Sequence, residues 1–309
     1  MSKTRVVISG LLYPMTMLHW FWRAFERRDD IELFVTGPFF GSSIPWNNGM
    51  TLPQRYVKQP DLPLPQQSAR MNVGSTIVEV QMPEHMRNPD LWIQIDAGWH
   101  FNNRPEAGIV ALVETDPHVL KSHYQCPKGY SDFVFSMQTP YIESGEFYLP
   151  YGYDPEIHQP NPEVEKEYDA CLIGLHYNSR SALVSSLQNK GYKVYYSIGE
   201  IYDEYRRIYN ASKIALSWSS KEDLCARNWE ALAMKNLLVA NRVPDMSTFF
   251  VDGQHYLGFD TLEEAASKVE WALKNPEEAN KIASAGHRKV KHHTWDARVQ
   301  QLLETVRLR

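Results

Sequence analysis

The stretch between residues 213 and 241 constrains the fold more than any other part of the sequence. Apolar runs at 213–220 and 237–241 indicate two buried strands, with a polar turn and a helix between them. This order predicts a βαβ unit in a parallel sheet. Glu222 follows the first strand, and Glu230, separated from it by seven residues, lies near the start of the helix. Open α/β sheets bind ligands at the carboxyl ends of their strands. A carboxylate there can accept hydrogen bonds from two neighbouring ribose hydroxyls.

The rest of the sequence predicts two successive α/β halves. Residues 4–10, 15–28 and 31–36 form strand, helix and strand, and the first turn lacks a G-x-G-x-x-G pattern, so no dinucleotide is expected there. Residues 149–155 are rich in turn formers and indicate a domain boundary. Further strands are predicted at residues 76–80, 91–96, 108–113, 132–136, 147–149, 169–174 and 193–198.

Two helices of the second half have capping signals at their starts. Asn178 or Ser179 is predicted to cap the helix after the first strand of this half. Thr261, followed three residues later by Glu264, predicts a capping box at the start of a helix over residues 262–274. Further helices are predicted at residues 202–210 and 295–306.

Residues 39–72 form a long irregular segment with five prolines. A loop of this length inside a compact domain is usually functional or mobile. We interpret it either as a recognition element for a ligand of this half or as a surface excursion without a role.

Composition limits the classes of function. The 309-residue chain has a net charge of −5 and no long basic run, so a broad nucleic-acid-binding surface is not expected. Cys126, Cys171 and Cys225 are widely spaced and match no metal-binding pattern; we expect reduced thiols, no metal and a cytoplasmic location. The first apolar run has the length of a strand rather than of a signal peptide. No stretch approaches the roughly 20 apolar residues of a membrane span.

Several motifs of the second half form an ordered set. They are residues 168–174 followed by Arg180, residues 208–216, residues 227–231, residues 250–253 and residues 294–298. Together with the two glutamates, this set resembles the GT-B glycosyltransferases of the group 1-like family, and most closely their spore-maturation (CgeB-like) branch. The resemblance covers the second half well and the first half weakly. It implies an α/β fold of GT-B architecture, with two Rossmann-like doubly wound domains facing a central cleft.

The resemblance also implies a domain division and an activity. Residues 1–155 are expected to bind the acceptor and residues 156–293 the nucleotide sugar, while residues 294–309 form a helix that crosses back onto the first domain. The implied reaction transfers a hexose or similar sugar from a nucleotide diphosphate sugar, with a UDP-sugar as the expected donor, to an acceptor hydroxyl. Retention of configuration is expected. The donor is a substrate, and no cofactor or metal is implied.

The two glutamates receive different roles from the resemblance. Glu230 is expected to accept the ribose hydroxyls of the donor, and Glu222 to contact the sugar or to stabilise charge near it. The alternative for Glu230 is an exposed helix residue paired with Arg227, three positions earlier.

The diphosphate is expected to contact positive side chains. Arg180 lies in the first turn of a predicted helix, where a guanidinium and the helix N-terminus together stabilise a leaving group. Related enzymes add a lysine shortly after this arginine. Residues 181–188 contain none, so Lys221 or Arg227 is expected to substitute for it. Gly174, at the end of the preceding strand, completes the expected donor-binding set.

Asp116 and His118 follow the strand predicted at 108–113 and are the candidates for a base in the first domain. An inverting transferase needs a base to deprotonate the acceptor hydroxyl, whereas in a retaining one the departing phosphate can take that proton. A turn aspartate before Pro117 and a surface histidine explain the same pattern equally well.

The acceptor stays open among a glycan, a small molecule and modified DNA. Phage enzymes of similar fold glycosylate hydroxymethylated bases, and such an acceptor needs a basic rim, which Arg23, Arg27, Arg28 and Arg55 are able to supply. A second alternative is a binding module that has lost catalysis. It is supported by residues 223–225, because related enzymes have a Gly-Phe-Gly-like turn after the first glutamate.

Overall fold

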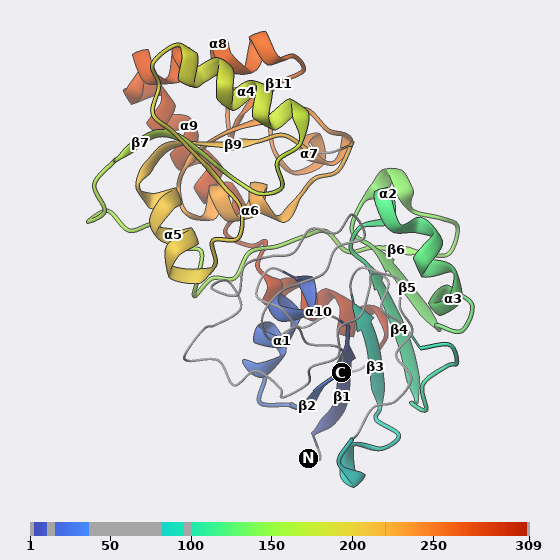
Figure 1. Ribbon diagram of the computed structural model, residues 1–309. Helices are drawn as coiled ribbons and strands as arrows, with labels where there is room; N and C mark the ends of the chain where they lie inside the picture. Colours follow the sequence, from blue (N-terminus) through green and yellow to red (C-terminus); the bar gives the residue numbers. More distant parts are fainter. Residues whose placement is uncertain (1–2, 11–15, 37–81, 96–100, 220, 308–309) are drawn as a thin grey trace. The chain divides into compact units, whose positions relative to one another are not determined.

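The computed structural model of the chain describes residues 3–10, 16–36, 82–95, 101–219 and 221–307 (Figure 1). The strand predicted at 76–80 and the proline-rich segment at 39–72 lie outside the described residues. The chain divides into two compact units, which we call unit 1 (Met1–Pro150 with Trp295–Arg309) and unit 2 (Tyr151–Thr294). Each unit is built around a parallel sheet of its own.

Unit 1 contains a six-stranded sheet with the order β2-β1-β3-β4-β5-β6, and all of its strand pairs are parallel. All of β3 and all but the first residue of β4 are buried, as is typical of a parallel strand covered on both faces. The strands are β1 (Thr4–Ser9), β2 (Ile31–Thr36), β3 (Leu91–Ile95), β4 (Ile109–Glu114), β5 (Phe133–Ser136) and β6 (Phe147–Tyr148).

The helices of unit 1 come from both ends of its sequence. In the first helix, Leu18, Phe21 and Phe25 recur at intervals of three and four residues and are buried, which explains its packing on the sheet. The helical segments are α1 (Met17–Glu26), η2 (Glu84–Met86), α2 (Pro117–Leu120), η3 (Lys121–Tyr124), α3 (Gln125–Lys128), η4 (Thr139–Tyr141) and α10 (Trp295–Thr305).

The last helix, α10, packs against α1 (Figure 1). The ring centroids of Phe21 and Trp295 lie 5.4 Å apart. Arg27 donates hydrogen bonds to both carboxylate oxygens of Asp296, at 2.7 and 2.8 Å. The expectation that the C-terminal helix crosses back onto the first domain is therefore confirmed.

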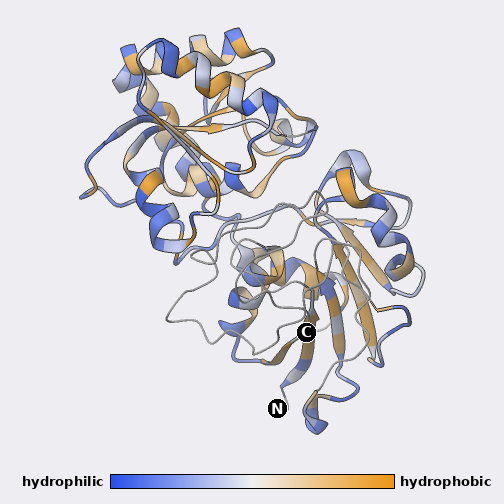
Figure 2. Cartoon of the chain, in the orientation of Figure 1, coloured by the Kyte–Doolittle hydropathy of each residue, from blue (hydrophilic) through white to orange (hydrophobic). Residues whose placement is uncertain are grey.

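Unit 2 contains a five-stranded parallel sheet with the order β11-β10-β9-β7-β8. Apolar residues of α4 and α8 pack with those of the strands into one buried cluster, and Figure 2 shows the hydrophobic strands between more hydrophilic helices. The elements are β7 (Tyr168–Ile173), α4 (Asn178–Asn189), β8 (Val194–Ser197), α5 (Tyr202–Asn210), β9 (Ser212–Ser217), α6 (Ala226–Ala233), β10 (Leu237–Asn241), α7 (Pro244–Phe249), β11 (Leu257–Phe259), α8 (Leu262–Lys274) and α9 (Pro276–Val290).

The cap predicted for α4 is wrong. Tyr177 stands at the N-cap with an extended backbone, and Asn178 already occupies the first helical position. The Cζ atom of Arg180 lies 4.7 Å from the centroid of the Tyr177 ring. A cation–π contact therefore lies at the start of α4, where a capping hydrogen bond was expected.

The cap predicted for α8 is confirmed. The Thr261 Oγ1 atom accepts a hydrogen bond from the Glu264 amide at 3.1 Å. The Glu264 carboxylate accepts from the amide of Asp260, at 2.9 Å, one residue before the cap. Both side chains thus bind amide groups near the start of the helix.

We expect the substitution Thr261→Ala to lower the free energy of unfolding by about 1 kcal/mol, because the Glu264 amide loses its acceptor. Urea denaturation followed by circular dichroism measures this loss. Thr305→Ala is the matched control, since that hydroxyl donates only to a carbonyl of its own helix; a change below about 0.5 kcal/mol is expected. Equal losses in the two variants would show that the cap is not the cause.

Candidate functional site

Two arginines converge on Gly174 at the carboxyl edge of the unit 2 sheet. Gly174 follows β7, Arg180 lies in the first turn of α4, and Arg227 lies in the first turn of α6. A Cβ atom added at Gly174 would lie 2.3 Å from Nη2 of Arg227 and 3.3 Å from Nη1 of Arg180. The absence of a side chain at this glycine therefore leaves the space that both guanidinium groups occupy.

Backbone carbonyls hold the two guanidinium groups. Arg180 donates through Nε to the carbonyl of Trp218 at 2.6 Å and through Nη1 to that of Leu175 at 2.9 Å. Arg227 donates through Nε to the carbonyl of Ile173 at 2.7 Å. Within the described ranges, the polar contacts of neither guanidinium include an ion pair with a carboxylate. The two positive charges are thus placed side by side, and direct contacts to backbone carbonyls rather than ion pairs hold them there.

The two arginines have different electrostatic surroundings. In spite of its burial, the pKa of Arg227 is raised by Cys225, two tyrosines and Glu230, whereas Arg180 is destabilised as a cation. Arg180 is only 4% exposed. Burial lowers the pKa of Arg180, and the neighbouring charge of Arg227 lowers it further. An anion bound here would reduce the repulsion and accept charge-assisted hydrogen bonds from both groups. The N-terminus of α4 adds the positive end of a helix dipole at the same edge. The arrangement is suited to a phosphate or a diphosphate.

Glu230 lies one turn beyond Arg227 on α6 and is 7% exposed. The Tyr205 hydroxyl donates a hydrogen bond of 2.5 Å to its Oε2 atom, and the Nε2 atom of His158 lies 3.8 Å from its Oε1 atom. The alternative interpretation of Glu230 as an exposed helix glutamate is therefore wrong. The carboxylate lies in a polar, largely enclosed position, and its charge acts on Arg227.

The other two donor-site candidates, Lys221 and Glu222, lie in the loop between β9 and α6 and are exposed. The amide of Lys221 donates to Oδ1 of Asp223 at 3.1 Å, and the Ser219 hydroxyl donates to the Lys221 carbonyl. These contacts order the loop backbone. The structure thus brings Gly174, Arg180 and Arg227 together, whereas the side chains of Lys221 and Glu222 extend from the surface of the loop.

Asp116 and His118 lie at the carboxyl end of β4 in unit 1. Asp116 is the N-cap residue of α2, and its amide donates a hydrogen bond to the Tyr124 hydroxyl oxygen at 3.3 Å. The His118 Nε2 and Asp116 Oδ1 atoms are 3.9 Å apart, beyond hydrogen-bond distance. The Asp116 side chain is 38% exposed and that of His118 only 5%. Asp116 is therefore the more accessible of the two.

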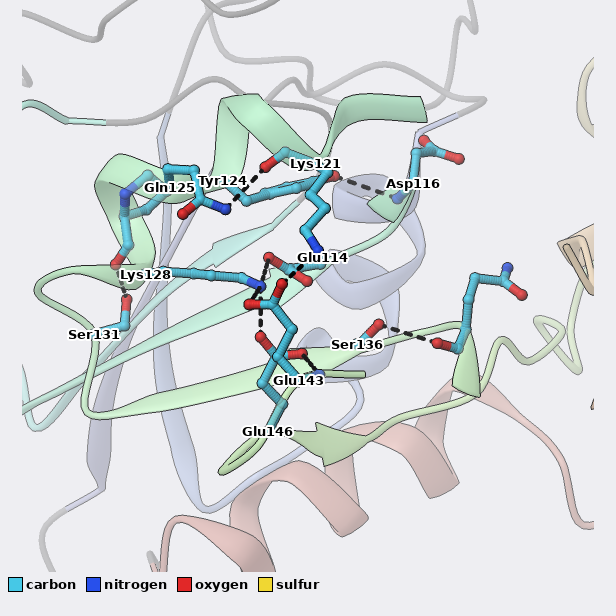
Figure 3. Close-up of polar contacts among 12 residues, drawn as sticks. Glu114, Asp116, Lys121, Tyr124, Gln125, Lys128, Ser131, Ser136, Glu143 and Glu146 are labelled. Atoms are coloured by element: carbon cyan, nitrogen blue, oxygen red, sulfur yellow. Dashed lines mark hydrogen bonds and ion pairs between the residues drawn. The ribbon is translucent and has the colours of Figure 1, made fainter. Parts of the chain in front are cut away.

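A half-buried lysine with three carboxylates lies next to this pair (Figure 3). The Lys128 Nζ atom lies 3.0 Å from Glu114, 3.1 Å from Glu143 and 2.5 Å from Glu146. Glu114, the last residue of β4, has a side chain that is 2% exposed. Figure 3 shows the Asp116 carboxylate pointing away from this cluster. We call Glu114, Lys128, Glu143 and Glu146 the Lys128 cluster.

Burial raises the pKa of Glu114 to about 7, in spite of the ion pair with Lys128. The carboxyl is easier to protonate in the folded chain than in the unfolded one, where its pKa is about 4.5. The contribution of this carboxyl to the free energy of unfolding is therefore fully present below pH 4.5 and is lost as the pH rises through 7. At pH 8 the lost contribution approaches about 3 kcal/mol.

We expect Glu114→Gln, which imitates the protonated carboxyl, to become more stable relative to wild type as the pH rises from 5 to 8. The difference in free energy of unfolding between the two proteins should grow by about 2 to 3 kcal/mol over this range. Urea denaturation at four pH values measures it. Glu156→Gln serves as the control, since Glu156 is exposed. A pH-independent difference for Glu114→Gln would contradict the raised pKa.

The sequence did not indicate Tyr205 or His158 as partners of Glu230. Tyr205 belongs to α5 and His158 to the segment before β7, 25 and 72 residues from Glu230. The topology of the sheet brings them together, and no local spacing indicates such a contact. The Lys128 cluster was also not predicted, although a glutamate at the end of the apolar run 109–113 is a signal of a buried charge.

The comparison of the sequence with protein families finds a match over most of unit 2 and over the returning helix α10. Residues 166–304 match a family model described as glycosyl transferase-like. Among curated proteins, none matches the sequence. The chain therefore contains, over most of unit 2, a sequence similar to that of glycosyl transferase-like proteins.

Several solved structures are similar over nearly the whole chain. Sucrose-phosphate synthase from Thermosynechococcus elongatus has a TM-score of 0.64 at 10% identity, and the match covers 99% of this chain and 98% of that one. HepE of Anabaena, in complex with UDP-glucose, has a TM-score of 0.61 at 9% identity, with 98% and 99% covered. An α-glucosyltransferase in complex with UDP-glucose and DNA containing an abasic site has a TM-score of 0.62 at 9% identity, with 99% and 100% covered.

At such low identity these likenesses concern the fold. The two parallel α/β sheets and the returning C-terminal helix define the GT-B fold, so the predicted fold class is confirmed. None of the helices within the described ranges is long and apolar enough to span a bilayer. In the same part of the chain, no three His, Cys, Asp or Glu side chains are grouped so as to hold a metal ion.

Proposed function

We propose that the protein is a glycosyltransferase that moves a sugar from a nucleotide diphosphate sugar, with UDP-sugars as the first candidates, to an acceptor hydroxyl. The observation that carries this proposal is the pair of guanidinium groups at Gly174, held by backbone carbonyls rather than by carboxylates. A diphosphate is able to form direct charge-assisted hydrogen bonds with both guanidinium groups. The match of residues 166–304 to glycosyl transferase-like proteins supports the same activity.

In this proposal Arg180 and Arg227 bind the diphosphate, and Glu230 accepts hydroxyls of the ribose. Lys221 and Glu222, on the loop before α6, contact the sugar or the phosphate next to it. When the bond between the sugar and the diphosphate breaks, negative charge develops on the leaving oxygen. Guanidinium groups that already face this position stabilise that charge without reorganisation.

Unit 1 would bind the acceptor. Asp116 is the better candidate for a base because more of its side chain is exposed than that of His118. We infer retention of configuration, in which the departing phosphate takes the acceptor proton and a protein base is not essential. The acceptor class, the affiliation to the spore-maturation branch and a cytoplasmic location belong to the same proposal.

A thermal-shift panel with UDP, GDP, ADP and TDP tests the donor site in wild type and in Glu230→Ala. A ligand at 100 times its dissociation constant stabilises by about 2.7 kcal/mol. One diphosphate should raise the Tm of wild type and should have a smaller effect on the variant. Absence of a shift with every diphosphate and every intact nucleotide sugar would contradict the proposal.

Hydrolysis of the bound nucleotide sugar in the absence of an acceptor separates a transferase from a binding module that has lost catalysis. Slow release of free sugar, abolished by Arg180→Gln, is expected of the transferase. A nucleotide sugar that binds and is never hydrolysed favours the binding module.

We expect Gly174→Ala to weaken binding of the diphosphate about tenfold or more, because the new methyl group would displace the Arg227 guanidinium. Isothermal titration measures the affinity. Gly191→Ala is the matched control in unit 2: Gly191 also has a positive φ, of +89°, but a Cβ there meets nothing within 4 Å. The control should lose stability through backbone strain and keep its affinity. Equal affinities for Gly174→Ala and wild type would contradict the role of the arginine pair.

A further inference from the structure

The Glu230 carboxylate is approached at both of its oxygens by side chains from other parts of unit 2. Tyr205, on α5, donates to Oε2 at 2.5 Å. His158, in the segment before β7, places Nε2 at 3.8 Å from Oε1. Glu230 has only 7% of its surface exposed, so its carboxylate is enclosed with a hydrogen bond at one oxygen and an imidazole near the other.

The backbone fixes which nitrogen of His158 carries the proton. The amide of Asp154 donates to Nδ1 of His158 at 3.0 Å, so Nδ1 acts as the acceptor. In the neutral ring the proton is therefore on Nε2, the atom that faces Glu230. Oδ1 of Asp154 accepts from the amides of Glu156 and Ile157, which holds this turn in place. The imidazole is thus held with its Nε2 N–H toward the carboxylate, at 3.8 Å from Oε1, which is longer than a hydrogen bond.

The Tyr205 ring is held on two sides. Its centroid lies 4.5 Å from that of Tyr209 and 5.9 Å from that of His158, the latter in an edge-on arrangement. Burial and the charge of Glu230 both raise the pKa of Tyr205 well above its usual value. The hydroxyl therefore stays protonated over the working pH range and keeps donating to Oε2.

We propose that Tyr205 and His158 are positioning residues that fix the Glu230 carboxylate to accept both hydroxyls of a ribose, which makes the site selective for ribonucleotide donors over 2′-deoxyribonucleotide donors. This inference rests on the proposed function. A carboxylate offers about four lone pairs, and Tyr205 occupies one of them on Oε2. With its plane fixed, the carboxylate is able to accept hydrogen bonds from the 2′ and 3′ hydroxyls of a ribose at the same time. A 2′-deoxyribose lacks one of these hydroxyls, so one charge-assisted hydrogen bond is lost.

A purely structural role for these two side chains predicts a different result. If they only stabilise unit 2, their removal weakens the binding of ribonucleotides and of deoxyribonucleotides by the same factor. If they position Glu230, their removal mainly weakens the ligand that has both hydroxyls. The ratio of the two affinities is therefore the informative quantity, and it is insensitive to a general loss of stability.

The experiment measures the Kd of UDP, GDP and ADP and of their 2′-deoxy counterparts by isothermal titration with the full chain. The variants are Tyr205→Phe, which removes only the hydroxyl, and His158→Asn, whose amide is able to accept the Asp154 N–H but does not reach Glu230. Tyr195→Phe is the matched control, since it removes a 2.8 Å bond from a tyrosine hydroxyl to another glutamate of unit 2, Glu200.

Wild type and Tyr195→Phe should prefer the ribonucleotide about tenfold or more, the value of one hydrogen bond to a charged group. In Tyr205→Phe this preference should fall to about twofold, with most of the loss in the ribonucleotide, and in His158→Asn it should fall by a smaller factor. An unchanged preference in both variants, while Glu230→Ala loses it, would overturn the positioning role and leave the proposed function intact. If Glu230→Ala binds every nucleotide as wild type does, the donor site itself is wrong.

Discussion

Arg180→Gln is expected to weaken binding of the diphosphate by about 10-fold to 100-fold while leaving the ligand-free chain at least as stable as wild type. The glutamine amide is able to donate to the Trp218 carbonyl, so the main change is the loss of one of two neighbouring positive charges. Removing that charge relieves repulsion in the free protein and removes attraction in the complex. Affinity and stability should therefore move in opposite directions, as at sites built for a ligand rather than for folding.

Arg242 provides the matched control for this prediction. It is also an arginine of unit 2, but it forms ion pairs with three carboxylates, those of Asp252, Asp260 and Glu264. Arg242→Gln should keep the affinity for the diphosphate and lose some stability, the reverse of the pattern for Arg180→Gln. Isothermal titration and thermal unfolding without ligand measure both properties. Added salt should weaken diphosphate binding more in wild type than in Arg180→Gln, because the variant has one positive charge fewer at the site for salt to screen.

Two results would contradict the assignment of the diphosphate to this pair of arginines. One is an affinity of Arg180→Gln equal to that of wild type. The other is a parallel loss of affinity in Arg242→Gln, which would indicate a general effect of charge on binding. Arg180→Lys distinguishes charge from geometry, since it keeps the charge and loses the planar fork that binds two oxygens, and an intermediate affinity is expected.

Much of the fold was predictable because its signals are local. The strand at Leu237–Asn241 and the helices at Tyr202–Asn210 and Leu262–Lys274 have the predicted bounds. Each is defined by an apolar pattern or a cap within a few residues. The start of α4 was predicted wrongly, since Tyr177 contacts Arg180 there and no side-chain cap forms. That contact depends on the position of the Arg180 guanidinium, which is held by the carbonyl of Trp218, 38 residues away, so no local pattern indicates it.

The residues of the candidate site were predictable from the sequence, whereas most of their contacts were not. Gly174, Arg180 and Arg227 were expected together from the family resemblance, and they are neighbours. Their carbonyl partners come from the end of β7 and from the loops that follow β7 and β9, so they depend on the order of strands in the sheet. The partners of Glu230 come from two segments distant in sequence, and only the folded chain brings them to it.

Lys128→Met should be the most destabilising single substitution considered for unit 1, with a loss of about 3 to 5 kcal/mol at pH 8. It leaves Glu114, Glu143 and Glu146 around an apolar side chain, and Glu114 is almost fully buried. An unpaired buried carboxylate must either stay charged at high cost or take up a proton. The loss should therefore be smaller at pH 5, where Glu114, with a pKa of about 7, is already protonated in wild type.

Lys121→Met is the matched control, because this lysine contacts the same Glu143 but its side chain is 61% exposed. Its removal should cost less than about 1 kcal/mol. The double variant Lys128→Met with Glu114→Gln should recover part of the loss at pH 8, since the buried charge disappears together with its partner. Urea denaturation of the four proteins of this cycle gives the coupling energy between Glu114 and Lys128. If the losses of stability in the two single variants of the cycle add up in the double variant, Lys128 acts through Glu143 and Glu146 rather than through Glu114. If Lys121→Met loses as much stability as Lys128→Met, the burial of Lys128 is not the cause of the loss.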